Sequence, residues 1–342
     1  MSARGQPRHA TPGAAGLDPA AGVVLAVDVG GTKFRAALAA PGGVVLAELV
    51  EPTAQGPAGA IPGQVVAALA TLAARAGVGP GTVRAAGLAV PVAIDPRTGA
   101  TWSTQNVRGL TGLDLAAAFE RALGLPVALD NDGNCAALGE GRAGAAIGVA
   151  DYAVVVIGTG IGCGVVAGGR LVRGAHGGAG EIAFLPLGAD PWNERSRVRG
   201  AFETAVSGPA VRARVEAALA AGTSTVLWPG ARLADVARAA AAGDALATRL
   251  LDEEARLVAL GVASLAAVVD PELVVLGGGV GVVAGLLDPV RAHVATLAER
   301  PPVVVTGLLG DRAPLVGAIG LALEVAFGGR PGGGPPGATG TP

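Results

Sequence analysis

The chain is poor in cysteine, in aromatic residues and in charge. Only two cysteines, Cys135 and Cys163, occur among 342 residues, so no disulfide framework is expected and a reducing, cytoplasmic environment is predicted. Charged residues make up 15% of the chain and the net charge is −2, which gives no reason to expect nucleic acid or an anionic membrane as partner. The longest apolar run, 273–287, contains five glycines and is not expected to span a membrane.

Glycine, by contrast, is abundant, and half of the residues are apolar. Much of the glycine, 57 residues in all, lies beside strand-like apolar runs, where it indicates turns. The two ends are different in character: 1–22 is polar and proline-rich, and 328–342 is rich in glycine and proline. We expect a flexible leader and a disordered tail there, with a large apolar core between them.

Between these ends one pattern occurs twice. Residues 23–50 hold three strand-like runs joined by short glycine turns, and helix and strand patterns follow. The same order of strand and glycine turn restarts at Tyr152. This repetition predicts an α/β fold of two similar lobes with a cleft between them. We expect the first lobe at 23–129 and the second at 130–312, with a closing helix at 314–327 that packs back onto the first.

Glycine-rich turns follow three of the predicted strands. Because glycines let backbone N–H groups converge on an anion, the turns are predicted to hold the phosphates of ATP, although a single such turn is more often a plain hairpin. The residues concerned are Gly30, Gly31, Thr32 and Lys33 in the first turn, Thr159, Gly160 and Gly162 in the second, and Gly278 and Gly279 in the third.

A carboxylate, Asp28, ends the first buried strand. Burying an unpaired charge is costly, so something is expected to pair with it. The prediction is that Asp28 faces Mg²⁺ through water; the alternative is a carboxylate that only caps the turn.

A second polar cluster follows the short strand that is predicted to end at Leu129. Asp130 is best suited to capping the helix that begins there. Asp132 is placed to take the proton from a hydroxyl that attacks the γ-phosphate of ATP, and Asn131 can bond a sugar hydroxyl.

At this point the sequence resembles a known family. The segments "AVDVGGTK", "GLAVPVAIDPRTG", "NDGNCAALGE", "GTGIGCGVVAGGRLVRGAHGGAGEI", "ETAVSGPA" and "LVVLGGGV" are similar, in this order, to those of ROK proteins, which are bacterial repressors and sugar kinases. The likeness covers 23–328. It implies two actin-like (RNase H-like) ATPase lobes with a nucleotide and sugar cleft between them. It also implies a homodimer or homotetramer.

The resemblance implies a function as well. The expected reaction is ATP-dependent and glucokinase-like, with transfer of a phosphoryl group to the 6-hydroxyl of a hexose or hexose derivative. Asp132 falls on the catalytic base of the family. The substrate-binding positions fall on Asn106, Asn131, Asp132, Glu181 and Glu203. The alternative is a sugar-sensing ROK protein that does not catalyse and acts through a protein partner.

The chain departs from the family at its structural zinc site. The family histidine position is Phe184, and the cysteine positions fall on Glu194, Ser196 and Ala201, so no zinc is expected. One interpretation is an intact kinase of altered preference, in which packing by Phe184, Leu185, Pro186 and Trp192 replaces the metal. The other is a protein that binds a ligand without turning it over.

Three further features receive structural interpretations. Cys135 and Cys163 are predicted to be small buried residues. His176, in a glycine-rich turn, is predicted to be solvated or bonded to backbone, and 193–200 is predicted to be a solvated surface turn.

Overall fold

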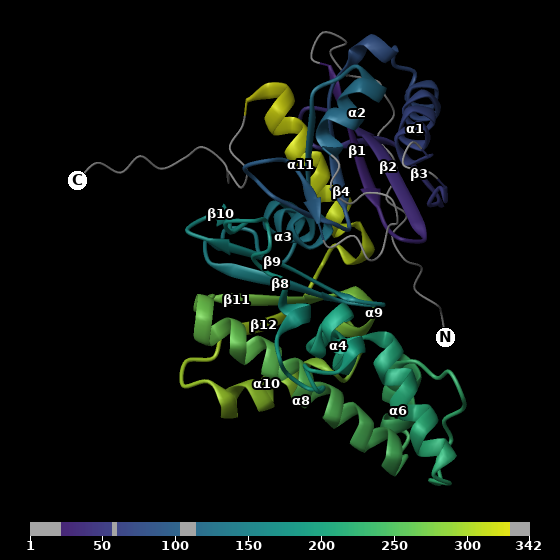
Figure 1. Ribbon diagram of the computed structural model, residues 1–342, viewed down its shortest axis with the longest axis vertical. Helices are drawn as coiled ribbons and strands as arrows, with labels where there is room; N and C mark the ends of the chain where they lie inside the picture. Colours follow the sequence, from purple (N-terminus) through teal and green to yellow (C-terminus); the bar gives the residue numbers. More distant parts are fainter. Residues whose placement is uncertain (1–21, 57–59, 103–113, 329–342) are drawn as a thin grey trace, which may run out of the picture.

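The computed structural model describes residues 22–56, 60–102 and 114–328, and two five-stranded sheets organise them (Figure 1). In the first sheet the strand order is β3-β2-β1-β4-β7, and in the second it is β10-β9-β8-β11-β12. The strands of the first are β1 (Val23–Val29), β2 (Lys33–Ala39), β3 (Val45–Pro52), β4 (Val83–Val90) and β7 (Val127–Asn131). Those of the second are β8 (Tyr152–Ile157), β9 (Ile161–Ala167), β10 (Arg170–Leu171), β11 (Leu273–Gly277) and β12 (Val303–Thr306).

The two sheets share one topology. In each, three strands in chain order pair antiparallel, and two later strands add in parallel beside the first of them. The predicted duplication of an α/β unit is therefore confirmed. A two-stranded hairpin, β5 (Ala93–Ile94) with β6 (Thr101–Trp102), follows β4.

Each sheet is buried on both faces. Alternate residues of β1 point to opposite sides: Leu25 and Val27 pack against α1 (Ala60–Ala76) and α2 (Leu115–Leu123), whereas Val24 and Ala26 face α11 (Ala313–Phe327). Helix α3 (Asp132–Ala143) packs against one face of the second sheet. Its other face shares one apolar core with α5 (Ala201–Val206), α6 (Gly208–Ala220), α7 (Leu233–Ala241), α8 (Ala245–Val269) and α10 (Leu287–Leu297).

Helices α3 and α11 lie against each other between the two sheets (Figure 1). Two glycines make this contact possible. A methyl group on Gly317 of α11 would lie 1.9 Å from the carbonyl oxygen of Cys135 in α3, and one on Gly139 of α3 would lie 2.2 Å from that of Ala313. The close packing places the N-terminus of α3 at the junction of the two sheets.

Shorter elements complete the described chain: the helices α4 (Glu194–Arg199) and α9 (Gly278–Gly281), and the 3-10 turns η1 (Pro80–Thr82), η2 (Ile182–Phe184) and η3 (Gly310–Arg312).

Two local predictions are wrong. Strand β7 continues through Asn131 instead of ending at Leu129. The segment predicted as a surface turn forms α4, because the Asn193 side chain accepts a bond from Arg195 N–H at its start and Gly200, with φ 93°, ends it.

Among the helices of the described residues, none is long and apolar enough to cross a bilayer. Cys135 and Cys163 are both buried, as predicted.

Candidate active site

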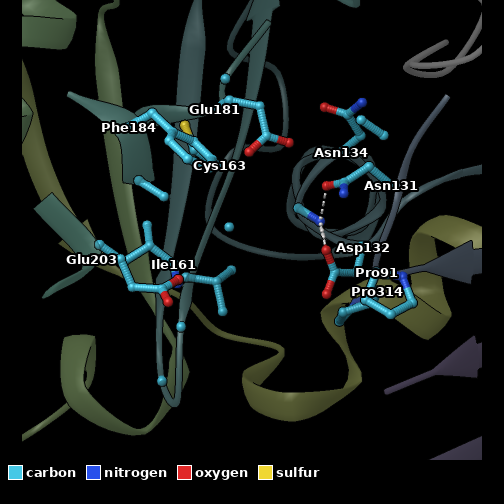
Figure 2. A pocket seen from close by; sticks show the side chains of 18 of the residues that line it. Pro91, Asn131, Asp132, Asn134, Ile161, Cys163, Glu181, Phe184, Glu203 and Pro314 are labelled. Atoms are coloured by element: carbon cyan, nitrogen blue, oxygen red, sulfur yellow. Dashed lines mark hydrogen bonds between the residues drawn. The ribbon is translucent and has the colours of Figure 1, made fainter. Parts of the chain in front are cut away.

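A cavity of about 270 Å³ lies between the N-terminus of α3 and the second sheet (Figure 2). It brings together seven of the residues predicted from the sequence: Asn131, Asp132, Thr159, Gly160, Gly162, Glu181 and Glu203. Figure 2 shows Asn131 and Asp132 on one side of the cavity and Glu181 and Glu203 on the other. Asn106 lies outside the described residues.

The wall with Asp132 is built by the start of α3. The Asn131 side chain caps the helix: its Oδ1 accepts from Gly133 N–H at 2.8 Å, and its Nδ2 donates to the Val92 carbonyl at 3.3 Å. Asp132 Oδ1 also accepts from Gly133 N–H, at 2.9 Å. Burial raises the pKa of Asp132 to about 6, and the bond from Gly133 opposes this rise. A carboxylate with that pKa can accept a proton near neutral pH.

Asp130 does not cap the helix, contrary to the prediction. It is buried, with 5% of its surface exposed, and its two carboxylate oxygens accept from the Asn131 N–H, from Asn134 Nδ2 and from Arg173 Nε. The prediction fails because β7 runs two residues further than expected, so the cap falls on Asn131. Arg173 was missed, since its partner is 43 positions away in the chain.

Asp28 stands at the end of β1, in the first sheet, and does not line the cavity. Its pKa is raised to about 7, mainly by burial and next by the charge of Asp132, so the two carboxyl groups are close enough to repel. A cation between them would relieve this repulsion.

The first glycine turn also lies outside the cavity lining. Gly30 N–H bonds the Lys33 carbonyl at 2.9 Å, and Gly31 and Thr32 are exposed. Lys33 Nζ bonds Asp311 Oδ2 at 2.6 Å, and Arg35 bonds the same oxygen at 2.8 Å. These two bonds lower the pKa of Asp311 to about 2.

The second and third glycine clusters lie side by side. Gly158 N–H bonds the Gly160 carbonyl at 2.8 Å, and the Gly158 carbonyl accepts from Gly208 N–H at 2.8 Å. A methyl group on Gly278, which has φ 76°, would lie 2.3 Å from the Ile157 carbonyl oxygen. The turn between β8 and β9 and the start of α9 therefore form one glycine-lined surface, of which Gly158, Thr159 and Gly160 face the cavity.

The opposite wall carries two more carboxylates. Glu203 Oε2 accepts from Ile161 N–H at 2.9 Å, and Oε1 accepts from Arg199 Nε at 3.1 Å, so both oxygens are held. The pKa of Glu181 is raised by burial and by the charges of Asp132 and Glu203. Arg199, a residue that the sequence reasoning missed, is a cation that lines the cavity.

The packing expected to replace the zinc site is found only in part: Leu185 packs against the core of the second sheet, whereas Phe184, Pro186 and Trp192 are exposed. Phe184 lines the cavity but is 42% exposed, and Trp192 is 85% exposed. Ser196 within the segment is buried. Phe202, just after the segment, is also buried, and its ring lies so close to Gly261 that a methyl group there would be 2.5 Å from it. Among the described residues no group of three His, Cys, Asp or Glu side chains could hold a metal ion.

His176 is exposed, as predicted, but it is also paired. Its Nδ1 lies 3.0 Å from Arg97 Nη2 and 3.5 Å from Asp95 Oδ2.

Two sheets of the same strand order, with glycine turns and acidic residues around one cavity, define the class: this is an actin-like ATPase fold of two lobes. The model of the ROK family matches residues 24–325. The chain therefore belongs to the ROK family.

Solved structures show the same likeness over nearly the whole chain. A ROK hexokinase from Thermus thermophilus is 33% identical, with a TM-score of 0.74, and the match covers 90% of this chain and 100% of that one. A ROK glucokinase from Streptomyces griseus, solved with glucose and AMPPNP, is 30% identical, with a TM-score of 0.70 and coverage of 88% and 99%.

The matches to curated relatives are shorter. The glucokinase of Halalkalibacterium halodurans is 32% identical over 173 residues, which are 49% of this chain and 52% of that protein. The bifunctional enzyme NanE/NanK of Brucella suis is 39% identical over 162 residues, 46% of this chain and 29% of that protein. The chain thus matches about half the length, or less, of these relatives.

Proposed function

We propose that this protein is an ATP-dependent sugar kinase that transfers the γ-phosphoryl group of Mg·ATP to the 6-hydroxyl of a hexose or hexose derivative. The observation that carries the proposal is the position of Asp132: its carboxylate stands at the start of α3 and shares one cavity with the Gly158–Gly160 turn and with Glu181 and Glu203. The similar Streptomyces griseus glucokinase, solved with glucose and AMPPNP, supports this assignment.

The residues around the cavity divide into two groups by chemistry. The turn at 158–160 offers backbone N–H groups and the Thr159 hydroxyl, which suit phosphate oxygens. The carboxylates of Glu181 and Glu203 accept hydrogen bonds, which suits sugar hydroxyls. A methyl group on Gly160 would lie 2.6 Å from Glu203 Oε2, so a side chain there would displace this carboxylate. Phosphate and sugar sites are thus adjacent, as direct phosphoryl transfer requires.

The donor set fits Mg²⁺ and does not fit zinc. Asp28 is a buried carboxylate at the end of β1, and burial and the charge of Asp132 raise its pKa although Arg35 and Lys33 oppose the rise. Mg²⁺ is commonly held by one or two carboxylates together with phosphates and water. Asp28 would hold it through water, and the ion would neutralise charge on the phosphates.

In the reaction we propose, Asp132 accepts the proton of the attacking hydroxyl and Glu181, Glu203 and Asn131 orient the sugar. Asn131 Oδ1 accepts from Gly133 N–H and its Nδ2 donates to the Val92 carbonyl, so one lone pair of Oδ1 and the second N–H of the amide are left for the sugar. Arg199 and Ile161 N–H hold Glu203 in one orientation. We further propose that 23–129 with 314–327, and 130–312, move as two lobes that close on the sugar and exclude water.

The test is hexose-dependent release of ADP from Mg·ATP by the purified protein, without added zinc. We expect turnover with at least one of glucose, mannose, fructose, N-acetylglucosamine, N-acetylmannosamine and allose. Identification of the product by NMR as the 6-phosphate tests the hydroxyl. Binding of ATP with no turnover of any sugar would favour a sugar-sensing protein over a kinase.

A further inference from the structure

A buried carboxylate, Asp130, joins strand β7 of the first sheet to the segment that follows strand β10 of the second sheet. Asp130 belongs to β7 of the first sheet, and its Oδ1 accepts from the Asn131 N–H at 2.9 Å and from Asn134 Nδ2 at 2.7 Å. Its Oδ2 accepts from Arg173 Nε at 2.8 Å, with Arg173 Nη2 also at 2.8 Å. Asp130 therefore contacts Asn131, which immediately precedes Asp132, and also Arg173, which follows strand β10 of the second sheet.

Arg173 begins the segment that leads to Glu181. It lies two positions after β10, and its carbonyl accepts from Ala179 N–H at 3.1 Å, which closes the segment on itself. The segment 173–181 contains four glycines, so it has little conformational preference of its own. Its position must therefore come from contacts with its surroundings.

Contacts with the β5–β6 hairpin hold the middle of this segment, among them the pairing of His176 Nδ1 with Arg97 Nη2 at 3.0 Å. Trp102 Nε1 donates to the His176 carbonyl at 2.7 Å, and a methyl group on Gly177 would lie 1.9 Å from the Ile94 carbonyl oxygen. The Arg173–Asp130 pair holds its start and is a charge-assisted bond to strand β7 of the first sheet. Such a bond, with two guanidinium nitrogens on one carboxylate oxygen, restricts the geometry more than a neutral contact does.

We propose that Asp130 and Arg173 are positioning residues, which set the distance between the wall of Asn131 and Asp132 and the opposing Glu181. Loss of either partner leaves the phosphate-facing turn untouched, because Gly158–Gly160 is held by Gly208 and not by this segment. The position of Glu181 relative to Asp132 should therefore become more variable, whereas the turn at 158–160 should keep its conformation. The expected change in hexose KM rests on the proposed kinase function. The expected loosening of the segment 173–181 does not depend on it.

The experiment compares Arg173→Met, Asp130→Asn and the double variant with wild type. Arg170→Met is the matched control, since Arg170 is an exposed arginine on β10, three positions earlier. Amide hydrogen exchange is measured without sugar, so that it reports on the segment even if the chain phosphorylates none of the sugars offered. We expect amides of 174–181 to exchange at least about tenfold faster in the three test variants and unchanged in the control.

Steady-state kinetics provide the second measurement. We expect the hexose KM to rise about 10-fold or more in each single variant, with the KM for Mg·ATP within about twofold of wild type. The double variant should resemble the single variants, because both substitutions break one interaction. Arg173→Lys should show a smaller rise in the hexose KM than Arg173→Met, since it keeps the positive charge.

Four results would overturn the proposal. Exchange in 174–181 that stays at the wild-type rate would show that the pair does not hold the segment. Faster exchange throughout the chain would show that Asp130 and Arg173 stabilise the whole fold and do not act on this segment in particular. A rise in the KM for Mg·ATP equal to that for hexose, or effects that multiply in the double variant, would show that the two residues do not act together on the sugar site.

Discussion

Asp28→Asn should make the protein more stable at high pH. Asp28 is buried and its pKa is raised to about 7, above the ordinary value of 3.8, by burial and by the charge of Asp132. The folded state therefore binds this proton more tightly than the unfolded state does. The free energy of unfolding therefore falls as pH rises from about 4 to about 7. Above that range Asp28 is ionised in both states, and its full destabilising effect is present.

The magnitude follows from the two pKa values. A rise from 3.8 to about 7 corresponds to at most about 4 kcal/mol at pH 8. An asparagine cannot ionise, so the variant should gain up to that amount at pH 8 and differ little from wild type near pH 4. Urea denaturation followed by circular dichroism at both pH values measures the difference.

Asp311→Asn is the control of opposite sign. Bonds from Arg35 and Lys33 lower the pKa of Asp311 to about 2, so this carboxylate contributes stability at neutral pH that is lost as pH falls toward 2. Its replacement should destabilise the protein at pH 8. The reasoning is refuted if Asp28→Asn is less stable than wild type at pH 8, or if its effect is the same at both pH values.

The remaining predictions concern catalysis, selectivity and packing. Because only ionised Asp132 accepts a proton, kcat/KM should fall about tenfold per pH unit below its pKa of about 6; a profile that is flat from pH 5 to 8 would exclude this role. Phe184→His supplies a polar partner at the cavity edge, so the ratio of kcat/KM between glucose and its epimers should change about tenfold, and an unchanged ratio would mean that this position does not contact sugar. Gly317→Ala should destabilise by about 3 kcal/mol through its clash with the Cys135 carbonyl. Gly320→Ala in the same helix, with its nearest atom 3.7 Å away, should stabilise by about 0.5–1 kcal/mol, and equal melting temperatures for the two would contradict the packing argument.

The doubled fold could be predicted because its signals are local. Apolar runs such as β1, followed at once by glycine turns, mark strands and their connections without any knowledge of distant contacts. The family motifs then placed Asp132, Glu181 and Glu203, which the structure brings to one cavity. Their order in the chain was sufficient for that prediction.

The features that could not be predicted depend on tertiary contacts, or on a choice among neighbouring residues that could each cap the same helix. Three polar residues follow one another from Asp130, and only the true end of β7 decides that Asn131 is the cap. The pairing of Arg173 with Asp130 spans 43 positions and has no local signature. Helix α4, by contrast, had readable end signals in Asn193 and Gly200.

The most direct test of the central claim compares wild type with Asp132→Asn in hexose-dependent ADP release, with ATP binding measured on both. The account predicts turnover of at least one hexose by wild type, a loss of about 10²–10⁴-fold in the variant, and unchanged ATP binding. Turnover by Asp132→Asn at the wild-type rate would contradict the assignment of Asp132 as the base, and ATP binding without turnover of any sugar by wild type would contradict the kinase itself.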